Sequence, residues 1–123
     1  MIDDNLKMRG TVRIEHYNES GVLQNVYNLN NLVVTGGKNY LAARAISNSQ
    51  PVISHVALGT GVATPDIGQV NLTAPTASPR VAFTSITTDG STIKTTTSFE
   101  AANSTGAITE AGIFIGASGD TLF

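Results

Sequence analysis

The chain has 123 residues, a formal net charge of −2 and no cysteine. This length suits one domain with one modest core, and the lack of cysteine excludes disulfides, thiolate catalysis and cysteine-based zinc sites. Charged residues make up only 13% of the chain and form no basic stripe, so we expect no nucleic-acid partner. The abundance of glycine, serine, threonine and asparagine favours a β-rich fold over a helical one.

The first residues predict an arm and not a signal peptide. Met1-Ile2-Asp3-Asp4 is acidic, whereas a signal peptide opens with basic residues. No stretch approaches the roughly 18 apolar residues of a membrane-spanning helix. We therefore expect no membrane association, synthesis in the cytoplasm, a polar N-terminal arm over residues 1–7 and a single domain over residues 8–123.

The first predicted element is a β-hairpin over residues 10–28. Apolar and polar residues alternate over residues 11–17, which is typical of a half-buried strand. Residues 18–21 are turn-forming, and β-prone residues resume at Val22. Residues 32–34 then predict a short apolar strand or staple.

A helix is predicted over residues 38–47, with Thr35 as its cap, because apolar residues fall near helical spacing among several alanines. We expect this helix to cover one face or open end of the sheet. The glycines before it lack the spacing of a nucleotide-binding loop, so we expect no cofactor.

Residues 53–61 predict the central strand of the domain. Ile53, His55 and Ala57 alternate with a second set of side chains, and the apolar run stops at a Gly-Thr-Gly turn. Gly59 and Gly61 are expected to adopt positive φ angles where the strand leaves the sheet.

The second half of the chain predicts a loop and three more strands. Residues 62–78 form a long loop, and loops of this length usually carry binding or subunit contacts. Asp89-Gly90 predicts a tight turn between strands at residues 81–87 and 91–99, and residues 108–115 form the last clear strand. Six to eight short strands and one helix indicate a mostly-β fold, an antiparallel β-sandwich or flattened barrel.

No constellation of residues indicates catalysis or metal binding. His16 and His55 have no ligand partner at metal-binding spacing, and no nucleophile elbow is present. Glu100 and Glu110 could approach one another across adjacent strands, but a solvated or arginine-paired acid is the more usual arrangement. We expect no enzyme activity and no bound metal.

Four sequence motifs occur in the order found in one family of proteins. They are a helix start at Thr35, an A-L-G-x-G strand end, a Leu72…Arg80 segment and an E-x-G-[IL]-F strand. Over residues 30–123 the chain resembles small virion proteins of tailed bacteriophages, in particular the baseplate-attachment domains of tail-collar fibres. The residues of structural or assembly interest are Gly59, Gly61, Arg80, Glu110, Gly112 and Phe114.

The chain departs from this pattern in two places. It lacks the acidic residue often found before the arginine, which leaves the partner of Arg80 open, and we expect Glu110 to pair with Arg80 or Lys38. Related chains continue past a Leu-Phe pair into a further strand. We therefore expect either a trimmed chain or a sheet completed by a neighbour's strand.

The resemblance implies a non-enzymatic structural protein of the virion, synthesised in the bacterial host cytoplasm. Its expected partners are tail, baseplate or major capsid proteins and further copies of itself, with tail or fibre attachment slightly preferred over capsid decoration. Docking is expected through residues 62–78 and the arm. A carbohydrate-binding module is the alternative of another class, but the chain has no tryptophan for stacking on sugars.

Overall fold

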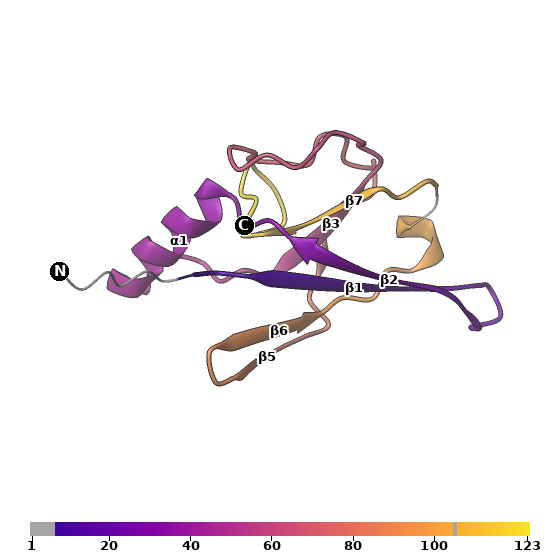
Figure 1. Ribbon diagram of the computed structural model, residues 1–123, viewed down its shortest axis with the longest axis horizontal. Coiled ribbons are helices and arrows are strands. Elements are labelled where there is room, and N and C mark those ends of the chain that lie inside the picture. Colours follow the sequence, from indigo (N-terminus) through magenta and orange to yellow (C-terminus); the bar gives the residue numbers. More distant parts are fainter. Residues whose placement is uncertain (1–6, 105) are drawn as a thin grey trace. The chain divides into compact units, whose positions relative to one another are not determined.

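The computed structural model describes residues 7–104 and 106–123. The chain divides into two units, Met1–Val33 and Val34–Phe123, which we describe separately. Within the described residues there are seven strands, one α-helix and one short 3₁₀ helix (Figure 1). Six of the seven residues of the predicted arm lie outside the described residues, and the single domain over 8–123 stays a prediction.

The first unit is an antiparallel β-hairpin. Strands β1 (Gly10–Tyr17) and β2 (Leu23–Asn31) pair along their length, and the side chain of Asn18 closes the turn by accepting two backbone N–H bonds. Cross-strand pairs place apolar side chains on one face. These pairs are Val12 with Leu29 and Ile14 with Tyr27. The hairpin prediction is confirmed.

Strand β2 extends further than the sequence predicts. It runs to Asn31, which pairs with Gly10, because the ladder uses backbone groups and tolerates the polar side chains of residues 28–31. The predicted short strand over residues 32–34 is absent from the structure. Val33 and Val34 are instead buried in irregular backbone.

Helix α1 (Thr35–Ile46) begins earlier than predicted. The N-cap residue is Val34, and no side chain caps the helix, so the prediction of Thr35 as cap is wrong. The N–H of Thr35 donates instead to the carbonyl of Ile67 at 2.8 Å. A carbonyl distant in sequence therefore accepts from one of the first N–H groups of the helix, which have no partner within the helix.

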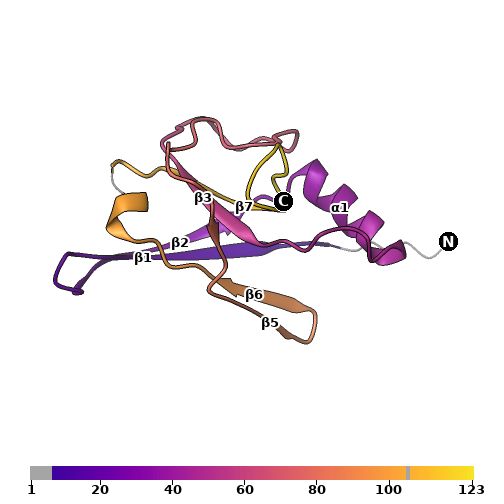
Figure 2. The same ribbon diagram turned by 180° about the vertical axis from the view of Figure 1, so that it is seen from behind.

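The second unit is built on an antiparallel sheet of order β4-β3-β7. These strands are β4 (Val81–Ala82), β3 (His55–Gly59) and β7 (Glu110–Phe114). Strands β3 and β7 lie side by side in both views (Figures 1 and 2). One face of the sheet carries the core. Its buried residues are Val34, Ala57, Leu72, Phe114 and Leu122.

The predicted strand over residues 81–87 is split into two. Its first part is β4, and its second part is β5 (Ser85–Asp89), which pairs with β6 (Thr92–Thr96). The change of sheet falls between Phe83, whose N–H donates to the carbonyl of Ser54 at 2.8 Å, and Thr84, whose N–H donates to the carbonyl of Thr96 at 2.7 Å. The predicted tight turn is confirmed, with Gly90 at a φ of 57°.

The mostly-β prediction with antiparallel sheets and one α-helix is confirmed, with 35% of the structure in strands. The sheets do not close into a barrel. Strand β3 is shorter than residues 53–61, but its predicted alternation holds, since Ile53, Ala57 and Gly59 are buried.

Candidate functional site

The carboxylate of Glu110 holds three backbone N–H groups at the end of the central sheet. It accepts hydrogen bonds from Gly61 at 3.1 Å, Thr73 at 3.1 Å and Ala74 at 2.7 Å. Both carboxylate oxygens are therefore engaged by backbone, and the predicted pairing with Arg80 or Lys38 is wrong. Hydrogen bonds to a charged acceptor are stronger than those between neutral groups, so Glu110 fixes the loop against the sheet.

Gly59 and Gly61 make room for this carboxylate. A Cβ atom on Gly59 would lie 2.6 Å from Cγ of Glu110 and 2.8 Å from the carbonyl oxygen of Ala74, and one on Gly61 would lie 2.8 Å from Cδ of Glu110. Neither glycine has a positive φ, so the predicted left-handed backbone is wrong. The two positions need glycine for close approach and not for backbone conformation.

Arg80 lies over the fully buried ring of Phe114. Its guanidinium carbon is 3.6 Å from the ring centroid, which is a cation–π contact. The same guanidinium donates to the carbonyls of Gly116 and Gly119 and to Oγ1 of Thr121. Burial lowers the pKa of Arg80, and the charge of Asp120 opposes this effect. The partner of Arg80 is thus an aromatic ring and the C-terminal loop.

Gly112 lies directly against the side chains of three core residues, Leu72, Phe114 and Leu122. A Cβ atom there would lie 2.7 Å from Cδ1 of Leu122 and 3.0 Å from Cδ2 of Leu72. All six residues singled out from the sequence therefore lie in one packed cluster at the β3–β7 sheet, although they are up to 55 positions apart along the chain. We call these six residues the sheet-end cluster.

Replacement of Arg80 by alanine is expected to lower the free energy of unfolding by about 1–2 kcal/mol, because the cation–π contact and the bonds to the C-terminal loop are lost together. Thermal denaturation followed by circular dichroism measures this. Arg80→Lys keeps the charge but loses the planar stack and the fork of donors, so an intermediate loss is expected. An Arg80→Ala variant as stable as the parent would contradict the assignment.

The histidines and acids do not assemble a reactive site. His55 Nδ1 lies 2.7 Å from the hydroxyl of Ser54, while His16 is exposed on β1. Glu100 is exposed and precedes the 3₁₀ helix η1 (Ala101–Asn103), so it is not on the strand next to Glu110. In residues 7–104 and 106–123 no group of three or more histidine or acidic side chains could hold a metal ion.

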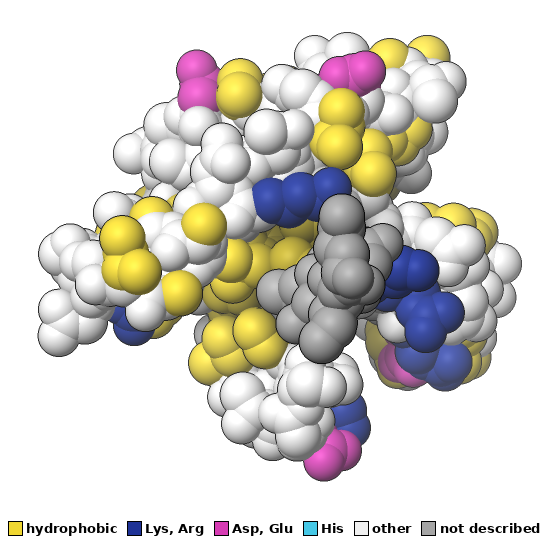
Figure 3. Space-filling view, turned by 60° about the vertical axis from the view of Figure 1, so that its left-hand side comes forward, with side chains coloured by type: hydrophobic (Ala, Val, Ile, Leu, Met, Phe, Trp, Pro, Cys, Tyr) yellow, Lys and Arg dark blue, Asp and Glu magenta, His cyan; other side chains and the backbone are white. Residues whose placement is uncertain are grey.

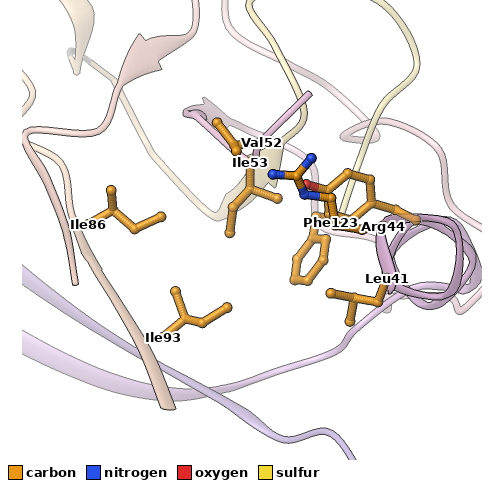
Figure 4. Close-up of a pocket in the computed structure, with 8 residues that line it drawn as sticks. Leu41, Arg44, Val52, Ile53, Ile86, Ile93 and Phe123 are labelled. Atoms are coloured by element: carbon orange, nitrogen blue, oxygen red, sulfur yellow. The ribbon is translucent and has the colours of Figure 1, made fainter. Parts of the chain in front are cut away.

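An apolar hollow of about 200 Å³ lies between α1, the β5–β6 hairpin and the C-terminus (Figure 4). Ile86 and Ile93, on the hairpin, point across it toward Ile53, Leu41 and Phe123 (Figure 4). Ile86 is 49% exposed and Ile93 is 50% exposed. Sequence reasoning missed this hollow, although Ile86 and Ile93, on the two strands of the predicted hairpin, lie on one face of it.

Charged residues make up 13% of the chain. In the face shown in Figure 3, uncharged polar and hydrophobic groups cover most of the visible area, with few acidic or basic side chains. No helix within the described residues is long and apolar enough to cross a membrane.

The loop over residues 62–78 is irregular, as predicted, but is anchored in its second half. Leu72 is buried, and Thr76 donates to the carbonyl of Leu58 at 3.0 Å, next to a bridge between Gly59 and Pro75. This half belongs to the structure around the sheet-end cluster. Residues 62–66 are all exposed.

Comparison of the chain with protein-family models, with curated proteins and with solved structures finds no match in any of the three.

Proposed function

We propose that this chain is a non-enzymatic structural protein of a tailed-phage virion. It works by docking on other virion proteins, with attachment to the tail or fibres as the preferred placement. The proposal starts from the resemblance of its four motifs, in order, to baseplate-attachment domains of tail-collar fibres.

The observation that carries the proposal is the sheet-end cluster. The motifs are separate along the sequence, and the structure brings residues of three of the four into direct contact. The strand-end glycines surround the carboxylate of the E-x-G-[IL]-F motif, and the arginine covers that motif's phenylalanine. A set of motifs used to build one packed scaffold fits a structural protein, because its residues stabilise the fold and contact one another.

Exposed apolar side chains on a weakly charged surface support docking on protein. Ile86 and Ile93 border the hollow with half of their surface exposed, and Val52, at 57% exposed, also lines it. Apolar surface of this kind, when clustered, typically marks a place of contact with another protein.

The copy number of the chain per particle tests the proposal. Quantitative mass spectrometry of purified virions, scaled to the major capsid protein, is expected to give a few to a few dozen copies, as tail or fibre components have. Hundreds of copies would place the chain on the capsid as a decoration protein. Absence from particles would contradict the virion function. The carbohydrate-binding module would then be the remaining candidate, which a glycan-binding assay tests.

A further inference from the structure

Strand β7 has an outer edge that is only partly covered. Within the described residues it is the last strand of the β4-β3-β7 sheet. On its outer side Phe114 forms a bridge with Leu122, and the N–H of Phe123 donates to the carbonyl of Ile113 at 2.9 Å. Residues 121–123 therefore run antiparallel to β7 and cover its C-terminal half.

Ala111 is the next residue of β7 whose backbone faces outward. In an antiparallel strand the N–H and C=O of one residue point the same way, and this direction alternates along the strand. The carbonyl of Phe114 faces β3, where it accepts from Ser54 at 3.0 Å, whereas that of Ile113 faces the C-terminal segment. Ala111 faces the same side as Ile113, is exposed, and has no strand paired to it there in the described part of the chain.

This part of the edge is not protected in the usual ways. Proteins block exposed strand edges with charged side chains, proline or bulges. The uncovered residues are Glu110, Ala111 and Gly112, and their pairing with β3 is regular. The one charge among them is turned away from the edge, because the Glu110 carboxylate binds the N–H groups of the loop. Within the described residues of the second unit, the edge is therefore open to another polypeptide backbone.

We propose that this edge binds an extended strand of a neighbouring virion protein. The strand runs antiparallel to β7, in line with residues 121–123. Its backbone forms hydrogen bonds with the N–H and the C=O of Ala111. This inference rests on the proposed function and identifies its docking surface.

The register specifies the chemistry of the incoming strand. The residue opposite Gly112 shares the face on which Leu122 and Leu72 meet above that glycine, so it must be apolar. The residue opposite Ala111 lies on the other face of the sheet. A second copy's β7 is a poor occupant, because Phe123 already covers the outer edge at Ile113 and leaves two such strands only three residues to pair.

The test uses the full chain with its edge filled in cis. One variant adds Val-Thr-Val after Phe123, which places valine opposite Gly112 and threonine opposite Ala111. The matched control adds Gly-Pro-Gly, which has no apolar side chain and no N–H at the middle position. Amide hydrogen exchange is expected to slow about tenfold or more at Ala111 in the first variant relative to the control. Equal exchange in the two variants would overturn the proposal.

Assembly distinguishes this inference from the proposed function. In particles made with each extended chain as the only source, the Val-Thr-Val variant is expected to be incorporated about tenfold less than the control, because its edge is occupied. Equal incorporation of both, with Ala111 protected, would overturn the docking edge and leave the virion function standing. Absence of even the unextended chain from particles is the outcome that removes the virion function itself.

Two further measurements test the source of the strand. The unextended chain is expected to sediment as the same species as the Val-Thr-Val variant. A dimer that the extension abolishes would make a second copy the occupant and overturn the proposal. An intact mass from particles that includes residues after Phe123 would place the strand in cis and overturn it as well.

Discussion

Replacement of Glu110 by alanine is expected to lower the free energy of unfolding by about 2–4 kcal/mol. The change removes the acceptor of three backbone N–H groups, from Gly61, Thr73 and Ala74. Those of Gly61 and Ala74 belong to part-buried bonds, and an unpaired donor that water does not reach carries its full desolvation cost. Chemical denaturation followed by circular dichroism measures the loss.

Two variants sharpen this experiment. Glu100→Ala removes the same charge from an exposed position and is expected to change the stability by no more than about 0.5 kcal/mol. Glu110→Gln keeps the shape, and its one oxygen can replace Oε1 and accept from Gly61 and Ala74, so only the N–H of Thr73 faces the NH₂ group and a smaller loss is expected. Equal stability of Glu110→Ala and Glu100→Ala would show that the three hydrogen bonds do not hold the loop.

Replacement of Gly59 by alanine is expected to cost about 2–3 kcal/mol, which is typical of overpacking in a filled interior. The added methyl group would lie 2.8 Å from the carbonyl oxygen of Ala74 and 2.6 Å from Cγ of Glu110. The carbonyl belongs to backbone that is itself hydrogen-bonded to Thr60 at 2.9 Å. Relief therefore requires displacement of the loop, which thermal unfolding detects as a lower midpoint.

Gly68→Ala is the matched control for this change. Its new Cβ would meet only the side chain of Asp66, at 3.1 Å, in an exposed turn, so little effect is expected. In the Glu110→Ala background, Gly59→Ala is expected to cost less than in the parent, because part of the clash is already removed. Additive effects of Gly59→Ala and Glu110→Ala would argue that the glycine and the carboxylate do not share this space.

The local elements of the fold were predictable because their signals are local. The alternation around Val12 and Ile14 and the Asp89-Gly90 turn each identify a hairpin within about ten residues of sequence. The split of residues 81–87 was not predictable in this way. It depends on Thr84 pairing with Thr96 directly after Phe83 pairs with Ser54, two contacts between residues that no periodic pattern relates.

In the candidate site, too, the local features were predictable and the distant contacts were not. The residue types of the sheet-end cluster were identified from the motifs, but their partners were not. Glu110 was expected to find a cation, since charge complementarity is the simplest rule for an acid. Its actual partners are backbone N–H groups, which every residue carries and which leave no mark on the sequence. The apolar hollow was missed because it forms between elements distant along the chain.

The Glu110 contacts have a consequence for how the chain folds. Its hydrogen bonds to Ala74, Thr73 and Gly61 close loops of 36, 37 and 49 residues, whereas the β5–β6 hairpin closes over two residues. Loop closure carries an entropic cost before the contact compensates for it, and nonlocal pairing of this kind slows folding. The hairpins are expected to form within about microseconds, and the central sheet is expected to assemble in a later, slower step in which strand, loop and carboxylate come together.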